Sequence, residues 1–208
     1  YTYNLEASAS KSIKDRLHLE VVGYYTWYRD AITTQPALFN GQSSIVYNGQ
    51  LSKVTANVNA GRAYLYGYSA SLKADLTNAL SLSSSLNYTY ARIQQSEGDT
   101  PLDHVPPLFG RTSMNLQLKR FRAEAFILYN GAKKLKDYNP NGEDNLQYAT
   151  PQGLPSWYTL NLRTAYQLTP HLQFQAALEN ITDRYYRVFA SGISAPGRNL
   201  VLTLRGSF

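Results

Sequence analysis

An alternation of apolar and polar residues with a period of two runs through this sequence and constrains its fold more than any other feature. In the segment 200–208, leucines occupy the first alternate positions, and Thr203 and Arg205 stand between them. Side chains of a β-strand point alternately to opposite faces, so this period predicts strands whose two faces meet different surroundings. The same pattern recurs at residues 3–10, 17–28, 64–75, 80–90, 114–119, 123–130, 160–168 and 172–179.

The length of these segments indicates that the strands cross a membrane. We expect about nine sequential strands of roughly ten residues, which is the length that spans a bilayer when a strand is tilted. One face of each strand is apolar, and the other is rich in Asn, Gln, Ser and charged residues. Such a face suits a wet lumen better than a second dry core. The predicted fold class is therefore all-β, an antiparallel transmembrane β-barrel segment built as a meander.

The connections between the segments alternate in length. Tight turns are expected at residues 14–16, 77–79, 119–121 and 169–171, and long connections near 30–60, 94–109, 132–156 and 182–197. Outer-membrane barrels combine short periplasmic turns with long outer loops in this way. Tyrosine and tryptophan gather at the long-loop ends of the strands, as at residues 24–28, and both residue types favour the headgroup zone of a membrane.

Composition argues against several other classes of protein. The chain of 208 residues has no Cys, and its 20 basic residues are scattered, so a net charge of +6 does not indicate a nucleic-acid partner. No apolar run is long enough for a membrane helix, and no G-x-S-x-G, Walker or H-E-x-x-H motif is present. We expect no enzyme, no cofactor and no resident metal. Because the sequence opens at Tyr1 inside an alternating pattern, we expect a longer precursor.

Residues 178–208 resemble the C-terminal end of TonB-dependent receptors. Members of that family typically carry N-x-x-D-x-x-Y, then a loop, P-G-R-N and a final strand that closes on an aromatic residue. We expect the asparagine and aspartate to hydrogen-bond nearby backbone, and the P-G-R-N residues to anchor the last strand. The resemblance gives the terminal aromatic a role in outer-membrane assembly. The matching positions are Asn180, Asp183, Tyr186, Pro196, Gly197, Arg198, Asn199 and Phe208.

The resemblance implies an outer-membrane receptor that imports a scarce nutrient. The whole barrel would have about 22 strands around an N-terminal plug, and residues 1–208 would be its C-terminal part without the plug. The implied partners are outer-membrane lipid and lipopolysaccharide, the rest of the same receptor, TonB through the missing part, and a small-molecule nutrient. That nutrient would be a ferric siderophore, haem, a corrinoid or a glycan. The alternative is a small autonomous outer-membrane barrel that acts as an enzyme or an adhesin.

Ligand contacts are expected in the outer loops at residues 30–60, 94–109 and 132–156, because loops on a rigid scaffold usually carry binding residues. For the histidine among the candidates, a solvated loop position is the alternative to a residue that binds a metal or haem cargo. The candidates are His104, Lys133 and Lys134 in the loops, and Tyr24, Tyr28 and Arg163 on the lumen face.

The segment 123–130 is less regular than the others, because Phe126 and Leu128 stand on its polar face. On the same lumen face, we expect Glu124 to pair with Arg122, and Glu179 with Arg163.

An odd number of strands has a geometric consequence. The first and last strands, around Leu5 and Leu202, would both run toward the periplasm. Parallel neighbours do not fit an antiparallel barrel. We therefore expect a meander whose two edges do not meet, and each edge then needs a strand from residues that precede Tyr1.

Overall fold

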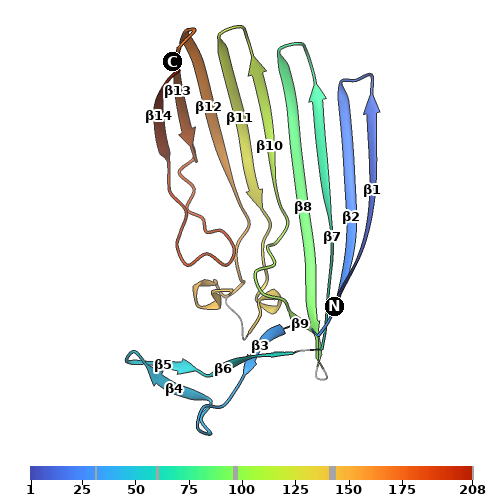
Figure 1. The fold of residues 1–208 in the computed structure, drawn as a ribbon. Coiled ribbons are helices and arrows are strands. Elements are labelled where there is room, and N and C mark those ends of the chain that lie inside the picture. The colour runs from blue at the N-terminus through green and yellow to red at the C-terminus, as the bar shows by residue number, and fades with distance from the viewer. Residues whose placement is uncertain (31, 60, 96–97, 141–143, 208) are drawn as a thin grey trace.

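A computed structural model describes residues 1–30, 32–59, 61–95, 98–140 and 144–207. Nine long strands form one continuous antiparallel sheet, in which every strand pairs with its neighbours along the chain (Figure 1). This confirms the predicted meander. The strands are β1 (Thr2–Ile13), β2 (Leu17–Arg29), β7 (Arg62–Asp75), β8 (Leu80–Gln94), β10 (Phe109–Gln117), β11 (Phe121–Asn130), β12 (Trp157–Thr169), β13 (Leu172–Glu179) and β14 (Asn199–Gly206).

The connections alternate as the sequence predicts. One end of the sheet carries the short turns that join β1 to β2, β7 to β8, β10 to β11, and β12 to β13 (Figure 1). The other end carries the long loops, which contain the two-residue strand β9 (Thr100–Pro101) and the 3-10 helices η1 (Leu135–Asp137) and η2 (Leu146–Tyr148). No helix in the described part of the chain is long and apolar enough to cross a bilayer.

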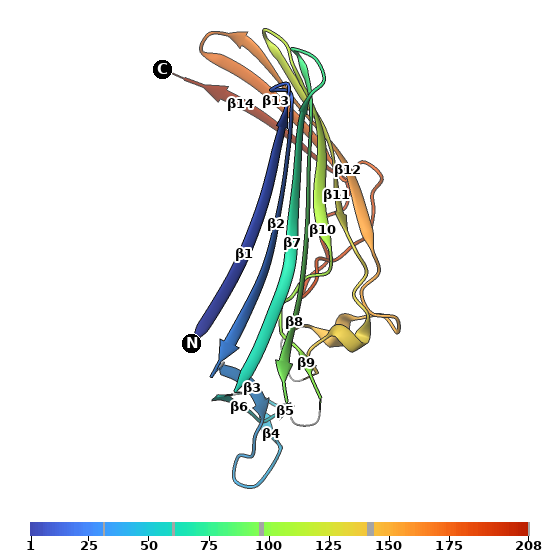
Figure 2. The ribbon, with the colours of Figure 1, turned by 90° about the vertical axis from the view of Figure 1, so that its right-hand side faces the viewer.

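The sheet is curved (Figure 2) and its two faces differ in chemistry. Directly paired residues share a face, so the pairing of Glu124 with Arg163 and that of Tyr25 with Tyr66 identify a polar and an apolar face. The polar face is the more crowded one, and Ser113 and Thr159 on it are only 2% and 1% exposed. Leucines on the apolar face remain open even within the sheet, as Leu162 on β12 does at 39%. The apolar face is therefore available to lipid, as the alternation predicts.

The two edge strands of the sheet are not paired with each other. The path of pairing begins at β1 and ends at β14, and every residue of both strands is exposed among the residues described. Both strands run toward the short-turn end of the sheet (Figure 1). The expected open meander with two free edges is confirmed.

A long hairpin between β2 and β7 has more structure than the loop predicted there. It consists of two small ladders, one of β3 (Ile32–Pro36) with β6 (Thr55–Asn59), the other of β4 (Ser44–Tyr47) with β5 (Gln50–Lys53). The turn between β4 and β5 is Asn48–Gly49, with φ of 48° and 77°. Asn-Gly favours the two left-handed conformations of a tight hairpin turn. This dipeptide was the sequence signal for the extra strands.

Aromatic rings line the long-loop end of the apolar face. The ring centroids of Tyr25 and Trp27 on β2 are 4.1 Å apart, and those of Tyr66 on β7 and Tyr90 on β8 are 5.1 Å apart. We call this set the aromatic belt, because it occupies the level at which barrel proteins place Tyr and Trp in the membrane interface. Its members are Tyr25, Trp27, Tyr64, Tyr66, Tyr68, Tyr88 and Tyr90.

Candidate functional site

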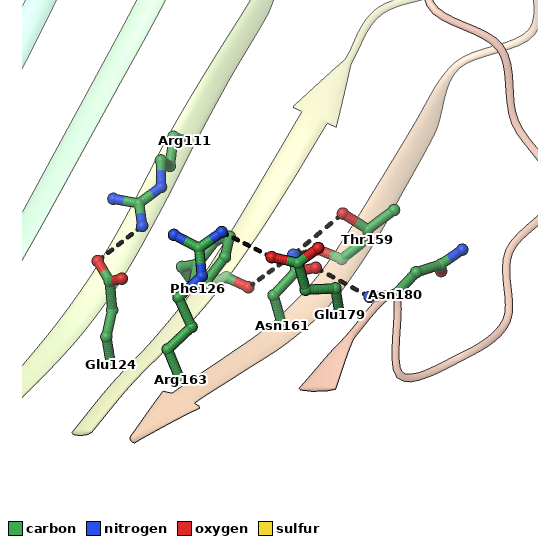
Figure 3. A network of polar contacts seen from close by, with 8 residues as sticks. All are labelled: Arg111, Glu124, Phe126, Thr159, Asn161, Arg163, Glu179 and Asn180. Atoms are coloured by element: carbon green, nitrogen blue, oxygen red, sulfur yellow. Dashed lines mark hydrogen bonds and ion pairs between the residues drawn. The ribbon is translucent and has the colours of Figure 1, made fainter. Parts of the chain in front are cut away.

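Two guanidinium groups cover one aromatic ring on the polar face. Phe126 of β11 is 5% exposed, although its strand position faces polar neighbours. The Cζ atom of Arg111 on β10 lies 4.3 Å from the centre of its ring, and that of Arg163 on β12 lies 4.9 Å away. Cation–π contacts of this kind stabilise an aromatic ring among charged groups. The irregular apolar position in the sequence thus marks the centre of a polar cluster (Figure 3).

Each arginine in this cluster also pairs with a carboxylate. Arg163 Nη2 lies 2.6 Å from Glu179 Oε1 on β13, as predicted. Glu124 does not pair with Arg122, as expected from the sequence, but with Arg111 at 2.6 Å (Figure 3). The contact with the Phe126 ring places the Arg111 guanidinium over β11, and there it lies within ion-pair distance of the Glu124 carboxylate.

The polar cluster continues to the end of β13 through amide groups. Asn161 on β12 is 5% exposed, and its Nδ2 donates to the carbonyl oxygen of Phe126 at 3.3 Å. Its Oδ1 accepts from the backbone N–H of Asn180 at 2.9 Å. The Asn180 side chain in turn accepts from the N–H of Arg184 and donates to the carbonyl oxygen of Pro196. Asn180 therefore joins the wall of the sheet to the loop that precedes β14.

The C-terminal motif residues meet where β14 begins. Asp183 Oδ1 accepts from the backbone N–H of Arg198 at 2.7 Å, and Arg198 Nε donates to the carbonyl oxygen of Ile181 at 2.9 Å. Asn199 pairs with Glu179 as the first rung of β14 on β13. A Cβ atom added to Gly197 would lie 2.6 Å from Asp183 Oδ1, so the absence of a side chain at Gly197 lets the Asp183 carboxylate approach the backbone here. Tyr186 packs its ring on Trp157, with centroids 4.2 Å apart. Phe208 lies outside the described residues.

The long loops between β11 and β12 and between β13 and β14 pack together at a small apolar core. Its buried members are Tyr138, Leu154 and Phe189, which are 5%, 9% and 8% exposed. The rings of Tyr138 and Phe189 meet edge to face at 5.2 Å. Burial raises the pKa of the Tyr138 hydroxyl. We call this packed unit the loop platform, and it lies at the long-loop end of β10 to β13 (Figure 1).

A buried carboxylate ties a third loop to the platform. Asp144 is 2% exposed, and its Oδ1 accepts from the backbone N–H of His104 at 2.8 Å. Its Oδ2 accepts from the N–H of Asn139 at 2.9 Å. A buried carboxylate is stable when its oxygens are hydrogen-bonded in this way. His104 adopts φ of 57° at this contact, and its side chain is exposed.

Lys133 is also buried in the platform. Its Nζ donates to the carbonyl oxygen of Val105 at 2.6 Å and lies 4.7 Å from the ring centre of Phe189. Burial lowers the pKa of this ammonium, against the opposing effect of Asp144 and Asp137. Lys133 therefore links loops. Its neighbour Lys134 is exposed, and both lysines line a groove beside Tyr90 and Arg92.

The structure brings only some of the predicted ligand residues together. His104 and Lys133 meet in the loop platform through Asp144 and Val105. Arg163 lies on the polar wall with Glu179, and Tyr24 and Tyr28 stand on β2, several strands away. Tyr24 shares a hydrogen bond of 2.6 Å with Thr89.

Sequence reasoning missed the central residue of the platform. Asp144 stands in a polar stretch that resembles an ordinary turn, and only the fold shows that its carboxylate is buried. Arg111 was missed because its partners, Phe126 and Glu124, lie on the next strand rather than nearby in sequence. The one sequence feature that pointed to this cluster was Phe126, an apolar residue at a position of the polar face.

The chemistry of these groups is that of binding and support. Among the described residues, no three His, Cys, Asp or Glu side chains gather in a way that holds a metal ion. In the polar cluster, the carboxylates of Glu124 and Glu179 are each paired with an arginine. The arrangement is thus a rigid wall with one wet face, one lipid-facing face and a packed set of loops at one end, which defines a portion of an outer-membrane β-barrel.

Comparison with known proteins agrees with this class. Residues 1–181 match the family model described as TonB dependent receptor-like, beta-barrel. The chain therefore belongs to the TonB-dependent receptors, which are outer-membrane transport proteins and not enzymes. No curated protein matches the chain.

Three solved structures illustrate the likeness. The copper transporter OprC superposes with a TM-score of 0.79 at 18% identity. The ferric enterobactin receptor PfeA from Pseudomonas aeruginosa gives a TM-score of 0.71 at 19% identity. The FrpB iron transporter from Neisseria meningitidis gives 0.71 at 11% identity. Each covers 100% of this chain, which spans only 31% of each of those chains. At these identities the likeness shows the fold.

Proposed function

We propose that this chain forms part of the wall and of the ligand-contacting mouth of an outer-membrane receptor that imports a small anionic nutrient, of the ferric-chelate type. The observation that carries the proposal is the loop platform, which Asp144 and the Tyr138–Phe189 contact hold as one unit at the outer end of the polar wall. Binding residues work best when such packing fixes their positions.

Charge and aromatic groups support an anionic cargo. The chain carries a net charge of +6, and cations at the loop end stand beside aromatic rings, as Arg187 does 4.5 Å from the ring centre of Tyr148. Positive surfaces raise the local concentration of anionic solutes. Ferric siderophores fit this chemistry better than neutral glycans do. The solved relatives are named for copper, iron or ferric enterobactin, so this type of scaffold serves several metal cargoes.

The alternative, a small autonomous barrel, has less support. Such a barrel closes by pairing its first and last strands, whereas β1 and β14 are unpaired edges in the part of the chain that the structure describes. We infer instead that these residues are the C-terminal part of a larger barrel. The remaining strands, a plug domain and TonB are its proposed partners, with the energy for import supplied through TonB.

A binding screen of the full-length receptor tests the proposal. Purified receptor is titrated with ferric siderophores, haem, corrinoids and glycans, and we expect binding in the first class. His104→Ala should weaken that binding about fivefold or more, which is the size of an ordinary contact residue. The matched control is His171→Ala, an exposed histidine in a short turn at the opposite end of the sheet. Binding to glycans alone, or equal losses in both variants, would contradict the proposal.

A further inference from the structure

Three arginines stand immediately beyond the aromatic belt on the apolar face of the sheet. Arg29 follows Trp27 at the next position of that face on β2, and Arg62 precedes Tyr64 in the same way on β7. Arg92 follows Tyr90 on β8 and pairs in register with Tyr64. We call these three residues the arginine rim. It marks the level at which the lipid-facing surface passes from the membrane interface into water.

Two members of the rim oppose each other directly. Arg29 and Arg62 are partners in the β2–β7 register, and both are exposed. Like charges at directly opposite positions destabilise a pair of strands. Neither arginine forms an ion pair with a carboxylate within the described ranges. Asp99, which lines the same pocket as both arginines, accepts a hydrogen bond from Tyr64 at 3.0 Å. An anion from outside the chain would neutralise this pair.

The third arginine borders a groove with more positive charge. Arg92 lies 4.2 Å from the ring centre of Tyr90 and forms an ion pair of 2.6 Å with Asp137. The same groove, of about 390 Å³, is lined by Lys134 and Lys136, both exposed and without an ion pair in the described part of the chain. Lys133 also lines this groove, so one carboxylate, that of Asp137, stands among four cations, and the groove keeps an excess of positive charge.

We propose that the arginine rim and this groove bind the phosphorylated headgroup of a glycolipid in the outer leaflet, the class to which lipopolysaccharide belongs. Guanidinium groups bind phosphate through paired hydrogen bonds, and ammonium groups add charge. The aromatic belt below the rim accommodates the acyl chains and the headgroup boundary. A lipid fits both features at once, whereas free phosphate uses only the cations. The inference depends on the outer-membrane location and not on the proposed cargo.

Lipid that co-purifies with the receptor measures this binding. The full-length receptor is extracted from its outer membrane in mild detergent, and bound phosphorylated glycolipid is counted by native mass spectrometry. The variants are Arg29→Gln with Arg62→Gln, and separately Lys134→Gln with Lys136→Gln. The control, Lys119→Gln with Arg120→Gln, removes two cations from a short turn at the opposite end. Near an anionic surface each cation contributes about 1 kcal/mol to the binding free energy. Each double variant should therefore retain at least about fivefold less lipid than the wild type.

A second measurement separates the lipid from other phosphates. Wild-type receptor in phosphatidylcholine nanodiscs is offered bisphosphorylated lipid A, its dephosphorylated form, or inorganic phosphate. We expect retention of the first only. Equal lipid in all variants, equal retention of dephosphorylated lipid A, or full displacement by inorganic phosphate would overturn the proposal. The loop variant changes exposed side chains outside the strands, so the test holds even if the strand variant fails to assemble.

Discussion

Tyr24 crosses the backbone of Gly67, and the tyrosine ring fills the space that a side chain at this glycine would need. A Cβ atom added to Gly67 would lie 2.5 Å from Tyr24 Oη and would also clash with the carbonyl oxygen of Tyr88. Tyr129 crosses Gly110 in the same way on the opposite face and donates to the carbonyl oxygen of Ser85 at 3.1 Å. Aromatic rings that cover strand glycines in this way help to fix register.

The variant Gly67→Ala should destabilise the protein by about 1–3 kcal/mol, because the new methyl group meets a backbone oxygen that cannot rotate away. The control is Gly23→Ala on the neighbouring strand, where a Cβ atom meets nothing within 4 Å. That control should be neutral or slightly stabilising. Urea unfolding of the purified receptor measures both, and equal midpoints would disprove the steric need for glycine at position 67.

Removal of the Phe126 ring should destabilise the polar wall. Phe→Ala in a packed site costs about 3–5 kcal/mol, and two guanidinium groups would lose their aromatic partner. Ile127→Ala, on the apolar face of the same strand and 39% exposed, is the control and should cost much less. Thermal unfolding in detergent provides the comparison. A smaller effect at Phe126 than at Ile127 would contradict the assignment of this ring as the centre of the cluster.

The variant Asp144→Asn should loosen the loop platform while leaving the strands in place. The amide keeps one acceptor, so it can satisfy either the N–H of His104 or that of Asn139 but not both. We expect faster tryptic cleavage next to Lys134 and Lys136, with an unchanged heat-modifiable band on gels. Asp30→Asn, at the same end of the sheet and in an exposed left-handed turn, is the control. Unchanged cleavage would show that the platform does not depend on this carboxylate.

Stability at high pH should report the burial of Lys133. Burial lowers the pKa of this lysine from its usual 10.5, so the unfolded chain keeps the proton to higher pH than the folded chain does. We therefore expect the difference in free energy of unfolding between the wild type and Lys133→Met to stay constant as the pH is varied around neutrality. It should rise with pH between the lowered pKa and the usual one. The exposed Lys136→Met is the control for a change in loop charge, and an equal rise in both comparisons would disprove the effect.

The sequence predicts the strands well because each one obeys a local rule. Leucines at alternate positions of β14 and the tight turn at 169–171 follow from the pleat and from turn chemistry. The number and order of the nine long strands are therefore predicted correctly, whereas the short strands β3 to β6 and β9 are not. Contacts between distant segments follow no such rule. The pairing of Arg111 with Glu124 depends on which long side chain the Phe126 ring holds, and the burial of Asp144 depends on how three loops pack.

The direction of the two free edges restricts any protein that completes this barrel. Because β1 and β14 both run toward the short-turn end, an antiparallel partner at each edge must run the opposite way. Strands inserted between those two partners must alternate, so only an odd number of additional strands closes the sheet. A complement with an even number of strands would leave one parallel seam, whatever its sequence.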